Sequence, residues 1–268
     1  MMPRAFRMLR SHIDGVDAVM ASTSHAFSRH IHDQFGIGVI SQGAQKSASG
    51  RGPVEAGAGD AITVNPGEVH DGAPIGDRGR SWRMLYISPA VIEECHRDIS
   101  DGRSSYGEFT HPVITDDRLA HRFECLFSLI TSGDEHDASF CEEQLLLLIA
   151  STTEVRSSVQ DRGIPHVIER AVSLMDDDPT STVGLSELAQ ISGLSRFQLL
   201  RGFAKATGLT PHAYLVQRRI QLARRLIAEG TPLIDAALAS GFADQSHMTR
   251  IFKKAYGLSP GAYAAAIR

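Results

Sequence analysis

Three histidines are the clearest candidates for ligand or metal chemistry in the first half of this sequence. His30 and His32 are separated by one residue, and His70 follows a turn that begins at Asn65. Alternate residues of a strand share one face, so a strand at this point directs His30 and His32 to the same side. Three imidazoles form an acceptable ligand set for Zn, Fe or Ni. Hydrogen bonding to a small molecule and a purely structural role are the other two readings.

One arginine could complete such a site. Arg83 lies in the run Ser81–Tyr86, which we expect to be a strand, and a guanidinium inside a barrel could pair with a carboxylate. A position on the outer surface of the strand is the other reading of Arg83. We predict an effector site formed by His30, His32, His70 and Arg83. The sequence requires no cofactor; a divalent transition metal, if one is bound, would use the three histidines.

A second group of residues forms a pattern that occurs twice near the C-terminus. The first copy consists of Leu185, Ala189, Gly193, Arg201, Phe203, Lys205, Gly208, Pro211 and Tyr214. The second copy consists of Leu233, Ala237, Gly241, Arg250, Phe252, Lys254, Gly257, Pro260 and Tyr263. Each copy predicts a short helix, a turn at glycine and a second helix with outward basic residues. Two such helix-turn-helix units, at 185–207 and 233–256, suit two neighbouring segments of the DNA major groove.

The second helix of each unit has a polar outer face. Leu199 and Phe203 should face the core in the first unit, as should Met248 and Phe252 in the second. The outward residues are Arg196, Gln198, Leu200 and Arg201 in the first, and Gln245, Ser246, His247, Thr249 and Arg250 in the second. Arginine can bind guanine through two hydrogen bonds, and glutamine can do so with adenine. For the phosphates we expect Lys205, Arg218, Arg219, Arg224, Arg225, Lys253 and Lys254.

The elements that position these residues differ between the two halves. Up to about Ser88, short apolar runs alternate with Gly, Pro, Asn and Asp turns, which favours a sandwich or barrel. Helical periodicity follows from Asp117, and a second helix is predicted at Glu142–Thr152. From Pro165 onward we expect only helices, with Ser195 and Asp244 as N-caps and a long connecting helix at Pro211–Glu229. We therefore predict an α+β protein with an effector domain at 1–155, a linker at 156–163 and a DNA-binding domain at 164–268.

Charge and composition agree with this division. The net charge of −4 separates into +4 from residue 164 onward and −8 before it, so the predicted DNA-binding part is the basic one. Three cysteines without a Cys-x-x-Cys spacing are typical of reduced thiols in a cytosol. We find neither an apolar run long enough to cross a bilayer nor a signal peptide, and therefore expect a cytoplasmic protein without a membrane partner.

The C-terminal part resembles the DNA-binding domain of AraC/XylS-type regulators. The resemblance covers about 100 residues and is carried by GLSRFQLLRGFAKATGLTPHAYLVQRRIQLARRLI at 193–227 and GFADQSHMTRIFKKAYGLSPGAYAAAIR at 241–268. It implies two helix-turn-helix modules joined by a long helix, each module placing one recognition helix in the major groove. By position it adds Phe197 to the base-contacting candidates. Leu200 departs from the polar residue often found there, and could contact a thymine methyl group.

Residues 20–90 resemble a cupin barrel, through His30-Ile31-His32 and through Gly59-Asp60, Pro66 and His70. Cupin enzymes hold a metal with an additional glutamate, which is missing after His32. The resemblance implies a transcription factor whose barrel binds a small-molecule effector, with double-stranded DNA, a second copy of the chain and RNA polymerase as partners, and without enzymatic activity. A metal-dependent cupin enzyme with a helical DNA-targeting tail is the rival hypothesis. Neither reading decides between activation and repression.

Overall fold

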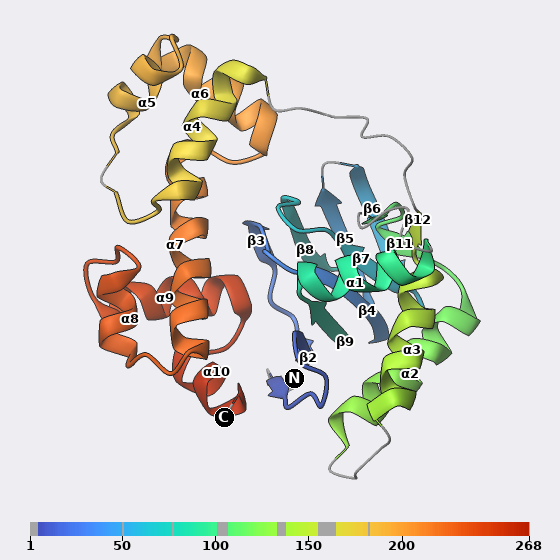
Figure 1. The fold of residues 1–268 in the computed structure, drawn as a ribbon. Coiled ribbons are helices and arrows are strands. Elements are labelled where there is room, and N and C mark those ends of the chain that lie inside the picture. Colours follow the sequence, from blue (N-terminus) through green and yellow to red (C-terminus); the bar gives the residue numbers. More distant parts are fainter. Residues whose placement is uncertain are drawn as a thin grey trace. The chain divides into compact units, whose positions relative to one another are not determined.

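The structure is a computed structural model that describes residues 5–49, 51–76, 78–100, 107–132, 138–154, 165–181 and 183–267. The chain divides into two compact units, Met1–Val159 and Gln160–Ala266 (Figure 1). Strands dominate the first unit and helices form the second, so the expected α+β class is confirmed. The linker expected at 156–163 lies outside the described residues, and the domain bounds stay a prediction.

The first unit contains two main sheets. The larger sheet has the strand order β1-β2-β9-β4-β7-β11, and the smaller has the order β3-β8-β5-β6. Their bounds are β1 Ala5–Leu9, β2 Val16–Thr23, β3 Phe27–His30, β4 Phe35–Gln42, β5 Ala44–Ser49, β6 Gly52–Gly57, β7 Ala61–Val64, β8 His70–Pro74, β9 Arg80–Ile87 and β11 Val113–Ile114. A short pair joins β10 Glu108–Phe109 to β12 Thr153–Glu154. Many short antiparallel strands with tight turns thus form the β-rich domain that the sequence predicted.

Helices cover one face of the larger sheet. They are α1 Pro89–Ile99, α2 Asp117–Thr131 and α3 Ala138–Ala150 (Figure 1). Leu85 and Ile87 of β9 share a buried apolar cluster with residues of these helices, whereas Trp82 and Met84 belong to a second cluster. Because side chains alternate along a strand, β9 separates two packed faces, and the second of them is the inner face of the domain.

The sequence predicted these helices only in part. The apolar stripe of α2, from Leu119 to Ile130, is buried as expected. Helix α3 begins and ends earlier than the expected Glu142–Thr152. Helix α1 was not predicted, although Ser88 caps it by accepting a hydrogen bond from the Val91 N–H and Pro89 occupies its first turn. That combination is a recognised start signal, so the helix could have been found from the sequence.

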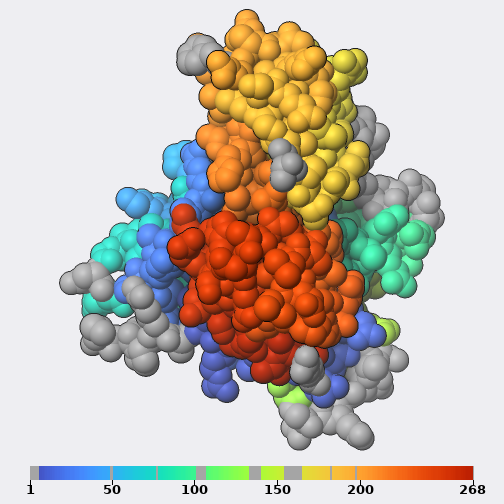
Figure 2. Space-filling view, turned by 90° about the vertical axis from the view of Figure 1, so that its left-hand side faces the viewer, coloured from blue at the N-terminus to red at the C-terminus, as the bar shows by residue number. Residues whose placement is uncertain are grey.

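The second unit consists of seven described helices. They are α4 His166–Asp177, α5 Leu185–Ile191, α6 Arg196–Thr207, α7 Pro211–Ala228, α8 Leu233–Ala239, α9 Gln245–Tyr256 and α10 Pro260–Ile267. Figure 1 shows α4–α6 around one end of α7 and α8–α10 around the other, and Figure 2 shows the atoms of this unit, coloured from yellow through orange to red along the chain. The connecting helix α7 buries Leu215, Ile220 and Ala223 as expected, with Ile227 in place of Leu226 as the buried residue near its end.

Candidate functional site

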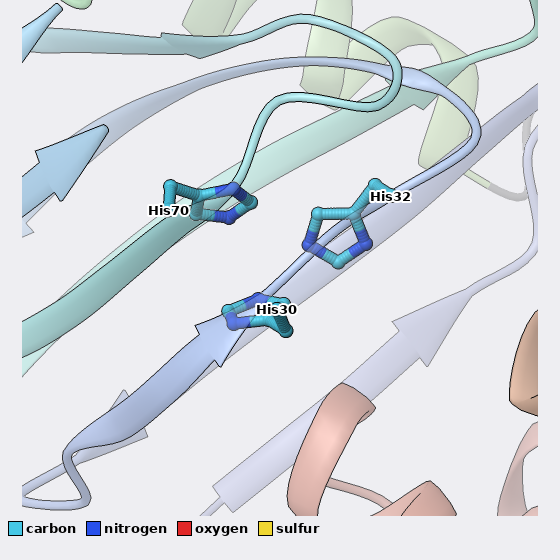
Figure 3. A group of neighbouring side chains, drawn as sticks. All are labelled: His30, His32 and His70. Atoms are coloured by element: carbon cyan, nitrogen blue, oxygen red, sulfur yellow. The ribbon is translucent and has the colours of Figure 1, made fainter. Parts of the chain in front are cut away.

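The histidines predicted to meet do meet. His30 pairs with His70 across β3 and β8. The ring centroids of His30 and His70 are 4.4 Å apart, those of His30 and His32 4.9 Å, and those of His32 and His70 5.1 Å. One nitrogen from each ring lies within 4.8 Å of the other two. In Figure 3 the three rings surround a shared space.

One detail of the expected placement is wrong. His30 is the last residue of β3, so His30 and His32 do not lie on one continuous strand. His70 is the first residue of β8, directly after the expected turn. Strand β8 pairs beside β3 at His30, and His32, two residues further along the chain, lies next to both other rings. Alternation along a strand therefore correctly predicted that His30 and His32 are neighbours, but it did not account for the position of His70, which depends on the pairing of β3 with β8.

Burial and hydrogen bonding determine the protonation state and the tautomer of His30 and His70. The Nδ1 atom of His30 is 2.8 Å from the Ser28 carbonyl, and that of His70 is 3.1 Å from the Glu68 carbonyl. Burial, together with the neighbouring His70, lowers the pKa of His30 to about 3. Burial also lowers the pKa of His70. Both rings are therefore neutral near pH 7, and because a carbonyl only accepts, each Nδ1 carries the proton.

The expected position of Arg83 near the histidines is wrong. Arg83 forms an ion pair with Glu124 of α2, and its guanidinium lies 5.6 Å from the centre of the Phe127 ring. Arg83 therefore lies on the helix-covered face of β9, with Leu85. His32, by contrast, contacts Tyr86 of the inner face, with ring centroids 5.0 Å apart. The alternation of β9 thus keeps Arg83 away from the histidines.

The arginine on the inner face is Arg80, which the sequence reading missed. It is 2% exposed, and its guanidinium lies 4.7 Å from the centre of the Trp82 ring and 5.8 Å from that of Phe27. It donates hydrogen bonds to the carbonyls of Gly72 and His25, while its Nε has no partner among the described residues. Burial lowers the pKa of Arg80 to about 10, so it remains charged near pH 7. Arg80 and Trp82 are two residues apart on one strand and therefore share a face. This spacing was the signal by which the sequence could have placed Arg80 beside Trp82.

The donor set of the histidines fits a metal of the transition series. Three imidazole nitrogens without a carboxylate suit zinc, iron or nickel and leave a coordination position open. Two nearby polar side chains are engaged elsewhere: Gln34 donates to Asp17, and Glu68 accepts from Asn65. His30, His32 and His70 are thus the described residues that could hold such an ion.

The first recognition helix, α6, is built as the sequence predicted. Ser195 accepts a hydrogen bond from the Gln198 N–H, and the Gln198 side chain accepts one from the Ser195 N–H, which forms a capping box. Leu199 and Phe203 are fully buried. Arg196, Gln198, Leu200, Arg201 and Lys205 are exposed, whereas the side chain of Phe197 lies outside the described residues. Because Gln198 is held by the cap, it is a weaker candidate for reading bases than we expected.

The second recognition helix, α9, presents a more open polar face. Asp244 caps it by accepting a hydrogen bond from the His247 N–H, and Met248 and Phe252 are fully buried. An open hollow of about 460 Å³ is lined by Gln245, Ser246, Thr249, Arg250 and Lys253. Lys254 is exposed next to it, and the His247 ring packs edge-on against Phe242. The structure thus gathers on one helix face five of the seven residues predicted for this module.

Two arginines predicted to neutralise phosphates are held within the second unit instead. Arg218 forms a two-pronged ion pair with Asp176 of α4, through Nε at 2.6 Å and a terminal nitrogen at 2.8 Å. The Tyr214 hydroxyl donates to the same carboxylate. Arg219 donates to the carbonyls of Pro179 and Ser181. These bonds tie α7 to α4 and the residues after it, so Arg218 and Arg219 have a structural role that spacing alone did not reveal.

Two family models match the chain. An AraC-like ligand-binding domain matches residues 21–149, and a helix-turn-helix domain matches residues 188–266. The first match contains all three histidines and Arg80, and the second contains both recognition helices. Among the helices of the part that the structure describes, none has the length and apolar character needed to cross a membrane.

Two relatives of this chain are named as transcriptional regulators. The chain is 30% identical to the HTH-type transcriptional regulator YbfI of Bacillus subtilis, over 83% of this chain and 81% of the relative. It is 32% identical to the HTH-type transcriptional regulator MtrA of Neisseria gonorrhoeae, over 39% of this chain and 34% of the relative. The first match, over 226 residues, is longer than either unit and therefore includes residues of both, whereas the second covers 106 residues.

Among solved structures, ToxT from Vibrio cholerae has a similar fold. An apo form aligns with a TM-score of 0.61 at 13% identity, covering 97% of this chain and all of that one. A form described as bound to an unsaturated fatty acid aligns with a TM-score of 0.58 at 14% identity, covering 98% and 97% of the two chains. At this level of identity the likeness concerns the fold of the two units.

Proposed function

Because the chain belongs to the AraC family of transcriptional regulators, with a ligand-binding domain followed by a helix-turn-helix DNA-binding domain, we propose that α6 and α9 read two neighbouring boxes of an operator. The observation that carries this proposal is the paired construction of the two helices. Each has a capped start, two fully buried apolar residues and an exposed face with arginine and lysine. Such a face can combine base contacts with phosphate contacts.

The base-contacting residues are proposed for each helix separately. In α6 they are Arg196, Leu200 and Arg201, with Phe197 by position and Lys205 at a phosphate. In α9 they are Gln245, Ser246, His247, Thr249 and Arg250, with Lys253 and Lys254 at phosphates. Two relatives, from Rhodococcus and Yersinia enterocolitica, are named as transcriptional activators. Activation is therefore the direction that we propose for this chain.

The DNA-binding proposal is tested by selecting binding sites from random DNA with the full chain. We expect two boxes with centres one helical turn, about 10–10.5 base pairs, apart. Affinity should fall steeply with salt, because each lysine or arginine that meets a phosphate releases a counterion. A chain that is folded by circular dichroism and selects no sequence would refute the proposal.

We propose that the effector carries an acidic group which binds Arg80. Buried charges in proteins are normally paired, yet no acidic side chain pairs with Arg80 in the described part of the first unit. The apolar rings of Phe27 and Trp82 flank the guanidinium and would accept the body of such a ligand. We thus propose an effector site formed by His30, His32 and His70, with Arg80 in place of Arg83.

The single tryptophan of the chain offers a direct assay for this effector. Trp82 lies against Arg80, so a carboxylate bound there should change tryptophan fluorescence. We expect Arg80→Gln to weaken the response to an active carboxylate by at least about tenfold, as loss of a charged hydrogen bond implies. Arg83→Gln, on the opposite face, is the matched control and should respond like the wild type. Equal responses of all three proteins would place the effector elsewhere.

We also propose that the chain forms a homodimer and is not an enzyme. Phe140 and Leu147 of α3 are large apolar side chains that are 45% and 39% exposed, and they are separated by two helical turns. A second copy could cover them; sedimentation of Phe140→Glu against the wild type tests this.

Contact with RNA polymerase and a cytoplasmic location stay predictions. The cupin-enzyme alternative is favoured by the histidine cluster alone, and turnover by the metal-loaded protein would support it.

A further inference from the structure

The histidine cluster is organised as a set of ligands rather than as a packed group of rings. The Nδ1 atoms of His30 and His70 are each held by a backbone carbonyl of the same chain segment, two residues away. A neutral imidazole that donates from Nδ1 has its lone pair on Nε2, on the far side of the ring. The two carbonyls therefore fix both the orientation and the tautomer of these rings, as the outer-shell partners of metal-bound histidines do.

The nitrogens of the three rings converge. The ligand atoms of His30, His32 and His70 lie within 4.8 Å of one another, and Figure 3 shows the rings turned toward one shared space. A bond from zinc to a histidine nitrogen is about 2.0–2.1 Å long. Even the widest triangle allowed by 4.8 Å requires each ring to move inward by less than about 1 Å to reach that length. A cation can therefore be bound with small movements of side chains.

The chemistry of the donors selects the class of ion. Three imidazole nitrogens are poor ligands for calcium and magnesium, which prefer oxygen, and good ligands for zinc, iron, nickel and copper. We propose that the first unit binds one divalent transition-metal ion through His30, His32 and His70. Three protein ligands leave at least one coordination position open. The rings of Phe27 and Tyr86 lie next to this cluster, with centroids 6.1 Å from His30 and 5.0 Å from His32 respectively.

This inference rests on the proposed effector site, because the ion would form part of it. The open coordination position would give the effector a second point of attachment beside Arg80. An oxygen or nitrogen donor of a small molecule could take this position. Binding of the ion itself needs neither DNA nor effector, so its failure can be told apart from failure of the regulatory proposal.

The test uses the full chain, stripped with EDTA and then freed of chelator. Cobalt(II) is the probe, since its visible absorption reports on the ligand field, and elemental analysis of zinc-loaded protein gives the stoichiometry. We expect one ion per chain. His70→Leu should weaken cobalt binding by at least about tenfold. Loss of a residue that only hydrogen-bonds to a metal ligand already lowers metal affinity by about 10- to 100-fold, and His70 would be a ligand itself. His111→Leu, at an exposed histidine of the same unit, should bind like the wild type.

A second control removes the strongest competing explanation. Cys125 and His121 of α2 form an exposed sulfur–nitrogen pair 3.5 Å apart that could hold cobalt on its own. Cobalt absorption that survives in His70→Leu and disappears in Cys125→Ser would overturn the proposal. Absence of stoichiometric uptake by the wild type would do the same. If His70→Leu does not fold, X-ray absorption of the wild-type cobalt protein decides, with three imidazole ligands expected and fewer than three contradicting the site.

Discussion

Replacing Arg250 by alanine is the sharpest perturbation of the DNA-reading surface that we propose. Arg250 is exposed on α9 and lines the open hollow with Gln245 and Thr249. Within the described residues it takes part in no hydrogen bond or ion pair. Its removal should therefore leave the free energy of unfolding within about 0.5 kcal/mol of the wild-type value. Any larger effect must then arise in the complex with DNA.

The magnitude of that effect follows from the contact expected. An arginine that binds guanine through two hydrogen bonds contributes about 1–3 kcal/mol of discrimination at one base pair. Arg250→Ala should therefore lower the preference at a single position by roughly 5- to 150-fold. Preference at the other positions should stay nearly unchanged. The salt dependence of binding should change little, because the lost contact is to a base.

Fluorescence anisotropy with a selected site and its single-base variants is the assay. Arg225→Ala is the matched control, since Arg225 is likewise exposed, on α7. If Arg225 meets a phosphate, its loss should weaken all sites alike and reduce the salt slope by about one. Our assignment of Arg250 is refuted if its variant weakens every site by the same factor, or if it retains the full wild-type pattern of preference.

Three further predictions concern the framework of the two units. Gln198→Ala should lower stability by about 0.5–1 kcal/mol through loss of the capping box while keeping the base preference of the wild type; a changed preference in site selection would contradict this. Asp176→Ala should lower the melting temperature of the second unit by on the order of 5–10 °C, because its partly exposed pair with Arg218 and its bond to Tyr214 are lost; an unchanged temperature in calorimetry would contradict this. His96 is buried, and burial lowers its pKa, so its contribution to stability should fall below about pH 6.5, where only the unfolded chain takes up the proton. In urea unfolding, His96→Leu should show a weaker loss of stability between pH 7 and pH 5 than the wild type; an equal loss would contradict the prediction.

The helical unit could be predicted closely because its signals are local. Ser195 and Asp244 cap their helices as expected, since an N-cap needs only the residue itself and the N–H groups that follow it. Leu199 and Met248 are buried because a helix repeats its faces every three or four residues. The pairing of Arg218 with Asp176 could not be predicted in this way, since it joins helices that are distant in sequence.

The inner face of the first unit was harder to predict, for a physical reason. β9 is packed on both faces, with Trp82 in one apolar cluster and Leu85 in another. Polar and apolar residues therefore do not alternate cleanly along this strand, and the pattern cannot distinguish inside from outside. The sequence therefore left both faces of the strand open for Arg83, the predicted effector site took the inner one, and Arg80 was overlooked. The histidines were predicted from their residue type and spacing, and pairing of β3 with β8 places His30 opposite His70.

The two recognition helices should contribute unequally to specificity. In α6, the Gln198 side chain is engaged in the cap, and Leu200 presents an apolar surface that is 36% exposed and offers no hydrogen bond. In α9, three of the hydrogen-bonding side chains that line the hollow are Gln245, Thr249 and Arg250. Base discrimination depends mainly on such donors and acceptors, whereas phosphate contacts carry no sequence information directly.

We therefore expect the box read by α9 to be the better defined of the two in the selected sites. Leu200→Ala should alter preference only at a position occupied by thymine, where an apolar contact with the methyl group is lost. The measurement is the information content of each box, assigned to its helix by the shift in preference that Arg250→Ala produces. Two boxes of equal information content would show that α6 reads bases as fully as α9, through Arg196 and Arg201, and the asymmetry inferred from the capping of Gln198 would then be wrong.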